Sequence, residues 1–88
     1  MLKPSFTKQF ERDLKKTFKR GQNKEKIKAI IQKLVNEEAL EPQYRDHKLM
    51  GSYKNQRECH IEPDWILIYK IEGESIIFER TGTHTDLF

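Results

Sequence analysis

The sequence contains one cysteine, Cys59, and no hydrophobic run that approaches the roughly 20 residues of a membrane span. A single cysteine excludes an internal disulfide, so the cysteine content gives no sign of an oxidising compartment. The N-terminus also lacks the charged and then apolar pattern of a secretory signal. The 88 residues are 35% charged. We therefore expect a soluble, cytoplasmic protein that folds as one domain over residues 1–88.

Acidic residues are scarce in the first part of the chain. Residues 1–40 carry 11 Lys and Arg against 5 Asp and Glu, whereas residues 41–88 carry 6 against 9. This asymmetry underlies a net charge of +3. It fits a polyanionic partner, either nucleic acid or an acidic protein, and it fits equally well a pair of Lys-rich helices with solvated faces.

Glycine and proline are few, and they separate the predicted elements. Pro4 restricts the first residues to a short edge strand or an irregular entry segment. Apolar residues then recur every four positions and predict a helix that ends at Gly21. Asn23 is the predicted N-cap of a second helix, which should fade near Glu38 to Leu40. The apolar residues of the first helix are Phe6, Phe10, Leu14 and Phe18.

Beyond Pro42 the apolar pattern changes from helical to alternating. We predict an α+β fold in which a short N-terminal strand and a two-helix hairpin precede a three- to four-stranded antiparallel sheet, with the helices on one face. Turns are expected at Gly51–Ser52, Pro63–Asp64 and Gly73. The predicted strands are 47–50, 56–62, 65–71 and 75–81, and a tail should follow from Gly82.

All three histidines follow residue 46, at His47, His60 and His84. A single histidine is more often structural or exposed than catalytic. Several together could take and give protons near neutral pH, as metal-free cleavage of RNA requires. Zinc is disfavoured, because Cys59 and His60 are adjacent in a strand and face opposite ways.

Other polar or aromatic residues near the histidines allow two interpretations each. Asp64 is equally well explained as a turn residue. Arg57 and Arg80 could contact phosphate or pair with glutamates. Trp65 fits a core position better than a base-stacking one, and Cys59 fits a small buried hydrophobe. From these residues alone, an enzyme and a binding module are nearly equal hypotheses.

Three segments of the C-terminal half resemble the YafQ branch of the RelE/ParE toxin superfamily. They are D-H-K-L-M-G-S-Y from Asp46, R-E-C-H-I-E-P-D-W-I-L-I-Y from Arg57 and F-E-R-T-G-T-H-T-D-L-F from Phe78. The most specific combination is H-x-E-P-D-W followed by R-T-G-T-H. The N-terminal half matches only in architecture. The resemblance implies a RelE-like fold and a type II toxin, a ribosome-dependent endoribonuclease that cuts mRNA in the ribosomal A site.

The resemblance also implies roles for individual residues. His84 would be the general acid, and His47, His60 and Asp64 would surround the scissile phosphate. Arg80 would hold phosphate and Phe88 would pack near the A-site bases, with no metal or other cofactor. Some relatives have an aspartate at position 58, where this chain has the longer Glu58, which we leave out of the site.

The implied partners are mRNA, ribosomal RNA and a DinJ/RelB-like antitoxin, with operator DNA contacted only through the antitoxin. Lysines and arginines of the two helices would meet ribosomal RNA and the acidic antitoxin. Two alternatives stay open. One is an inactive module of the same fold that only binds the antitoxin, and the other is a ParE-like toxin directed at gyrase. The histidine set disfavours both.

Overall fold

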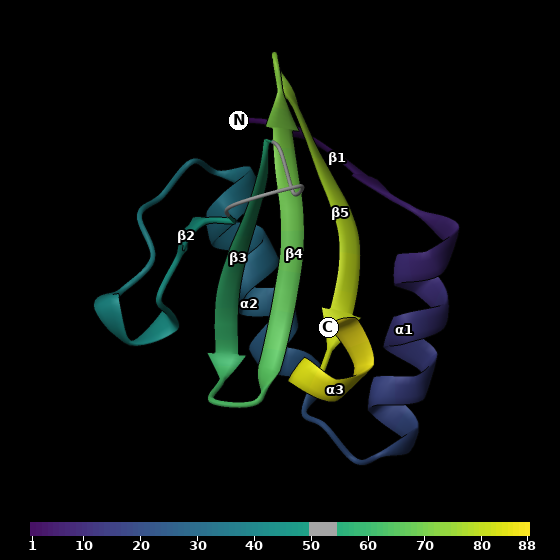
Figure 1. The fold of residues 1–88 in the computed structure, drawn as a ribbon. Coiled ribbons are helices and arrows are strands. Elements are labelled where there is room, and N and C mark those ends of the chain that lie inside the picture. Colours follow the sequence, from purple (N-terminus) through teal and green to yellow (C-terminus); the bar gives the residue numbers. More distant parts are fainter. Residues whose placement is uncertain (50–54) are drawn as a thin grey trace.

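The computed structural model describes residues 1–49 and 55–88 of the chain. The elements run from a first strand through two helices and a 3-10 turn to four strands and a terminal helix (Figure 1). The turn predicted at Gly51–Ser52 lies outside the described residues, as does Met50 at the end of the strand predicted over 47–50. The elements are β1 Lys3–Phe6, α1 Lys8–Lys19, α2 Lys24–Val35, η1 Pro42–Tyr44, β2 His47–Lys48, β3 Gln56–Glu62, β4 Trp65–Glu72, β5 Ser75–Gly82 and α3 His84–Leu87.

The strands form one mixed sheet with the order β1-β5-β4-β3-β2. Strands β2 to β5 pair antiparallel, which confirms the predicted antiparallel sheet. The N-terminal strand adds a fifth member, because β1 pairs parallel with β5 and places Phe6 opposite Phe78. The α+β prediction is confirmed, and the described sheet is wider by this one parallel edge strand.

The helices cover one face of the sheet, as predicted. Figure 1 shows α1 and α2 running in opposite directions, with α2 behind the sheet and α1 beside β5. The core lies between helices and sheet, and inward-facing residues of β3 and β4 alternate with outward-facing ones, as strand geometry requires. Phe10, Trp65, Leu67, Tyr69, Ile76 and Phe78 are among its most buried members. No helix in the described ranges is long and apolar enough to cross a membrane.

Two local predictions were wrong at their boundaries. The first helix begins at Lys8 rather than near Phe6, because Thr7 caps it by accepting a hydrogen bond from the Phe10 N–H at 3.0 Å. Phe6 instead ends β1 and stacks on Phe10 and Phe78. The second helix ends at Val35, slightly before the predicted fade.

The segment from Gly82 was predicted to be a tail, but it contains the helix α3. Its first residue follows a capping box in which the Thr83 hydroxyl accepts from the Asp86 N–H, and the Asp86 carboxylate accepts from the Thr83 N–H. The two bonds satisfy donors that a free helix end would leave unpaired. This motif places His84 at the start of the helix.

Candidate active site

Strand pairing brings two of the predicted histidines to one buried carboxylate. His47 lies directly opposite Glu58 in the pairing of β2 with β3, and its Nε2 is 2.9 Å from Glu58 Oε2. His60 follows Glu58 by two residues, so both point to the same side of β3. His60 Nε2 is 3.6 Å from the same Oε2 atom. Glu58 is only 7% exposed, and its carboxylate lies near both histidines.

Both ring nitrogens of His47 face acceptors. Nδ1 lies 2.5 Å from the carbonyl oxygen of Arg45, and Nε2 faces the Glu58 carboxylate. A carbonyl can only accept a hydrogen bond, so Nδ1 must donate. Nε2 is the nitrogen that lies against the buried carboxylate. The His47 ring is thus held at both of its nitrogens.

Asp64 and His84 form a second pair, 20 residues apart in the sequence. The Asp64 carboxylate accepts the His84 backbone N–H at 2.9 Å and lies 2.7 Å from Nδ1 of the ring. These two hydrogen bonds, the backbone one first, hold the pKa of the Asp64 carboxyl below its usual range. Because Asp64 engages Nδ1, Nε2 is the nitrogen of His84 that remains for proton transfer.

The two pairs meet at His60. Its ring centroid is 5.6 Å from that of His84 and 6.3 Å from that of His47. The side chains of His84 and His47 are about half exposed, at 54% and 50%, whereas that of His60 is 11% exposed. The predicted residues His47, His60, Asp64 and His84 therefore lie together, with the central histidine largely buried and the outer two open to solvent.

Arg80, the predicted phosphate contact, is engaged by a different residue. Its Nε donates to Asp13 Oδ2 at 2.8 Å, and Nη2 reaches Asp13 Oδ1 at 3.3 Å. Hydrogen bonding to Asp13 raises the pKa of the Arg80 guanidinium, so its charge is fixed. The Arg80 side chain is 37% exposed, which leaves part of the guanidinium open to a ligand.

The remaining candidates divide between surface and core. Phe88 is 55% exposed and lies at the surface. Trp65 is buried at 1%, and its Nε1 donates to the Thr81 hydroxyl at 3.0 Å, which confirms the core interpretation. Cys59 is fully buried, and burial raises the pKa of its thiol to about 12. It is therefore no nucleophile at neutral pH.

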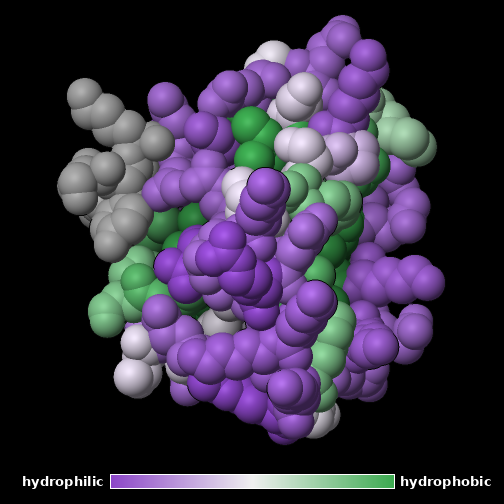
Figure 2. Space-filling view, turned by 90° about the vertical axis from the view of Figure 1, so that its right-hand side faces the viewer, coloured by the Kyte–Doolittle hydropathy of each residue, from purple (hydrophilic) through white to green (hydrophobic). Residues whose placement is uncertain are grey.

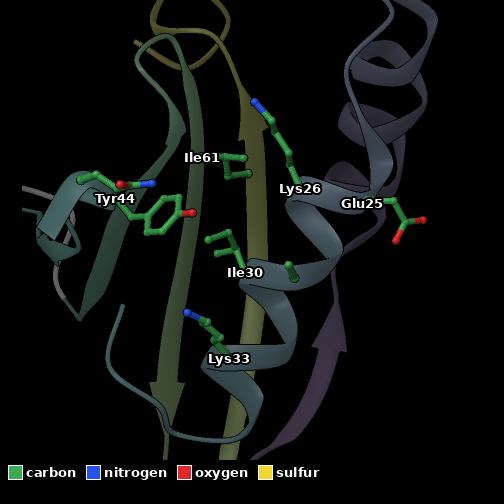
Figure 3. A pocket seen from close by; sticks show the side chains of 8 residues that line it. Glu25, Lys26, Ile30, Lys33, Tyr44 and Ile61 are labelled. Atoms are coloured by element: carbon green, nitrogen blue, oxygen red, sulfur yellow. The ribbon is translucent and has the colours of Figure 1, made fainter. Parts of the chain in front are cut away.

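A groove leads toward the site from the side of α2. Figure 3 shows Tyr44, Ile30 and Ile61 lining a pocket of about 400 Å³ between α2, η1 and β3. A neighbouring pocket of about 350 Å³ shares Tyr44 and Ile61 and reaches His60. The two pockets thus connect the helical side of the molecule with His60.

Glu58 is the site residue that sequence reasoning left out. Strand alternation placed it on the His60 face, but its contact with His47 depends on how β2 pairs with β3, which no local pattern gives. Asp13, the partner of Arg80, was also missed. Within the described residues no cluster of three metal-ligating side chains has the geometry of a metal site.

Comparison with known proteins identifies the family. A family model described as a bacterial toxin of type II toxin–antitoxin systems, YafQ, matches residues 2–88. The chain belongs to this family. The predicted resemblance to the YafQ branch of the RelE/ParE superfamily is thereby confirmed, and neither the inactive module nor the gyrase-directed toxin is favoured.

Individual relatives agree with this YafQ assignment. The chain is 46% identical to the mRNA interferase toxin YafQ of Escherichia coli K12 over 81 residues, which cover 91% of this chain and 88% of the relative. YafQ in the E. coli DinJ–YafQ complex is 42% identical and superposes with a TM-score of 0.93 over 100% of this chain and 99% of that one. A copper-bound mutant toxin from Helicobacter pylori, 39% identical, gives 0.96 over the full length of both.

Proposed function

We propose that this YafQ-family toxin is a cytoplasmic, ribosome-dependent endoribonuclease that cleaves mRNA and so stops translation. The observation that carries the proposal is the meeting of two carboxylate–histidine pairs, Glu58–His47 and Asp64–His84, on either side of His60. Acid–base cleavage of RNA needs two groups for proton transfer and positive charge near the phosphate. The relatives named mRNA interferase support the same substrate.

The proposed reaction begins with the RNA 2′-hydroxyl. Its proton passes to a general base as the 2′-oxygen attacks phosphorus. The bond from phosphorus to the 5′-oxygen then breaks, and a general acid gives that oxygen a proton. The products are a 2′,3′-cyclic phosphate and a 5′-hydroxyl. No metal is required, because each proton has a side chain to accept or supply it.

The contacts of each histidine suggest how these roles are divided. Nδ1 of His84 is engaged by Asp64, so Nε2 is available as the acid that protonates the leaving oxygen. His47 and His60 each face an acceptor at both ring nitrogens, and the contacts are shorter at His47. They are 2.5 Å to the Arg45 carbonyl and 2.9 Å to Glu58 at His47, against 3.4 Å to the Pro63 carbonyl and 3.6 Å to Glu58 at His60. We therefore assign the more tightly held His47 to offset charge on the phosphate, and His60 and His84 to the two proton transfers. Arg80 would add positive charge and Phe88 a stacking surface for a base.

The proposed partners follow from the family. A DinJ-like antitoxin would neutralise the toxin, since YafQ of E. coli forms a complex with DinJ, and operator DNA would be contacted through the antitoxin alone. The basic face of α1 would approach ribosomal RNA. Figure 2 shows that hydrophilic residues predominate on the side of the molecule carrying α1, with smaller hydrophobic areas between them. A mostly hydrophilic, Lys-rich surface suits contact with a polyanion.

The test is the substitution His84→Ala, expressed without antitoxin. We expect growth arrest to disappear while the two-dimensional amide spectrum still shows the native fold, because His84 is exposed and its backbone bond to Asp64 survives. Exposed Thr85, the next residue of α3, provides the matched control Thr85→Ala. Primer extension on a message from induced cells should show codon-phased cuts. Full toxicity of His84→Ala, or arrest by the wild type without such cuts, would overturn the proposal.

A further inference from the structure

The Asp86 carboxylate joins α3 to the end of α1. Within α3 it accepts the Thr83 N–H at 3.0 Å and completes the capping box. Across to α1 it accepts from Arg20 Nη1 at 2.6 Å and Nη2 at 3.2 Å, a two-pronged ion pair, and from Lys16 Nζ at 3.4 Å. The same side chain therefore both starts the terminal helix and connects it to another element.

Asp86 also packs closely against the backbone of Gly82. A Cβ placed on Gly82 would lie 2.9 Å from Asp86 Oδ2 and 3.0 Å from Asp86 Cβ, closer than real side chains approach. The Asp86 side chain is only 16% exposed, whereas Arg20 is 43% exposed. The carboxylate is thus confined between Gly82, the start of α3 and the guanidinium, and it has little freedom to move.

We propose that Asp86, held by Arg20, is a positioning residue for His84. His84 and Asp86 both lie on α3, a helix of four residues. An isolated helix of this length is not stable in water, so its orientation depends on its anchors. One anchor is the Asp64–His84 contact itself, and the other is the Asp86–Arg20 pair at the opposite end of the same turn.

The proposal rests on the role of His84 in the proposed function. It adds that the Asp86–Arg20 ion pair fixes the position of His84. A misplacement of about 1 Å at a reacting group can cost up to about 10²-fold in rate. It also changes the interpretation of two cations at the end of α1. The lysines and arginines of the helices were expected to meet ribosomal RNA, but Lys16 and the C-cap residue Arg20 pair with Asp86. Their removal should act on the rate of cleavage rather than on ribosome binding.

The experiment measures single-turnover cleavage on programmed ribosomes for Asp86→Asn and Arg20→Gln. We expect the maximal rate at saturating ribosome to fall about tenfold in both variants, with the half-saturating ribosome concentration unchanged within about twofold. Arg20→Lys keeps the charge and should restore most of the rate.

The matched control is Lys19→Gln. Lys19 is exposed, lies one residue before Arg20 and forms no ion pair within the described ranges, so it removes equal charge from the same helix end. If Arg20 serves only to bind RNA, Arg20→Gln and Lys19→Gln will both raise the half-saturating concentration and leave the maximal rate intact. That result would overturn the proposal.

A second measurement is independent of activity. The ¹⁵N signals of the His84 ring report which nitrogen carries the proton and whether Nδ1 still faces Asp64. We expect them to change in Asp86→Asn and Arg20→Gln, and to stay as in the wild type in Lys19→Gln. Unchanged ring signals would reject the positioning role. An inactive His84→Ala beside fully active Asp86→Asn would reject this inference alone, whereas a fully active His84→Ala would reject the proposed function.

Discussion

Glu58 and His47 face each other across neighbouring strands, with 2.9 Å between the carboxylate and Nε2. The acid is buried and the histidine side chain is half exposed. The carboxylate holds Nε2 and the Arg45 carbonyl holds Nδ1, while part of the ring still reaches solvent. The same carboxylate lies near His60. One glutamate thereby sets the orientation of two histidines of the site.

Replacing Glu58 by glutamine should therefore impair the reaction without unfolding the chain. A hydrogen bond to a charged group is worth about 1.5–3 kcal/mol, so we expect Glu58→Gln to lower the cleavage rate by about tenfold to a hundredfold. Single-turnover cleavage on ribosomes measures this. Glu62→Gln is the control, since Glu62 lies on the same strand but pairs with Lys26. Equal loss in both variants would show that Glu58 has no special role.

The ion pair of Asp13 with Arg80 should contribute to stability. The Asp13 carboxylate, 8% exposed, accepts from Arg80 and also from the Thr81 N–H at 3.2 Å. Asp13→Ala leaves a buried N–H without its acceptor, so we expect the free energy of unfolding to fall by about 2 kcal/mol. Urea denaturation gives this value. Glu11→Ala, on the exposed side of the same helix, should change it by less than about 0.5 kcal/mol. A similar small change for Asp13→Ala would contradict the prediction.

Acid should weaken the attachment of α3 to α1. Hydrogen bonds from Arg20, followed by that from the Thr83 N–H, hold the pKa of the Asp86 carboxyl well below its usual range. A carboxyl with a lower pKa when folded stabilises the fold above its unfolded pKa, about 3.9, and this stabilisation is lost as the pH falls toward the folded value. The difference in unfolding free energy between wild type and Asp86→Asn should be constant above about pH 5 and shrink below about pH 4.

Urea denaturation of both proteins across this pH range measures the difference. Glu11→Gln, whose side chain is exposed, should track the wild type at each pH. A wild-type advantage over Asp86→Asn that persists unchanged below pH 4 would show that the charge of Asp86 does not contribute.

Cys59 should resist alkylation in the folded protein. Its side chain is fully buried, and the pKa of its thiol is raised to about 12. The reactive thiolate is therefore scarce at pH 8, and iodoacetamide cannot reach it. Mass spectrometry should find the native protein unmodified after a treatment that fully labels the urea-unfolded chain. Rapid labelling of the native protein would show that β3 opens locally.

Much of the fold could be predicted from local patterns. Asn23 was expected to cap the second helix, and its side chain accepts from the Glu25 N–H at 2.9 Å. The strand predicted over 56–62 has the observed bounds, and Gly73 adopts a φ of +58° in its turn. These features depend on residues a few positions apart, which is why the sequence alone reveals them.

The errors arose where local and distant effects compete. Phe6 continues the four-residue spacing of the helix, but pairing with β5 draws it into a strand. The helix at His84 had a local signal in Thr83-x-x-Asp86, a capping box with aspartate as its acid. The prediction of a tail is wrong here because the acid of a capping box is usually Glu or Gln, and this one is Asp86.

The sequence predicted the main residues of the site but not the carboxylates that hold them in place. His47, His60, Asp64 and His84 were named from a motif, whereas Glu58 and Asp13 depend on long-range register. Simple strand alternation could not predict on which face Arg80 lies. A register shift between Ile68 and Tyr69 places Arg80 opposite Ile68 and Phe78 opposite Tyr69, and Glu79 has no opposite residue in this pairing. No periodic pattern predicts such a shift.

The parallel pairing of β1 with β5 has a consequence for synthesis. Lys3 pairs with Ser75, so the first strand has no neighbour until some seventy further residues have been made. Contacts this distant form late and slow the folding of a chain. His84 comes later still, so a growing polypeptide holds an unfinished fold and an unfinished set of histidines. A toxin directed at translation would thus stay harmless to the ribosome that is making it until its own synthesis is nearly done.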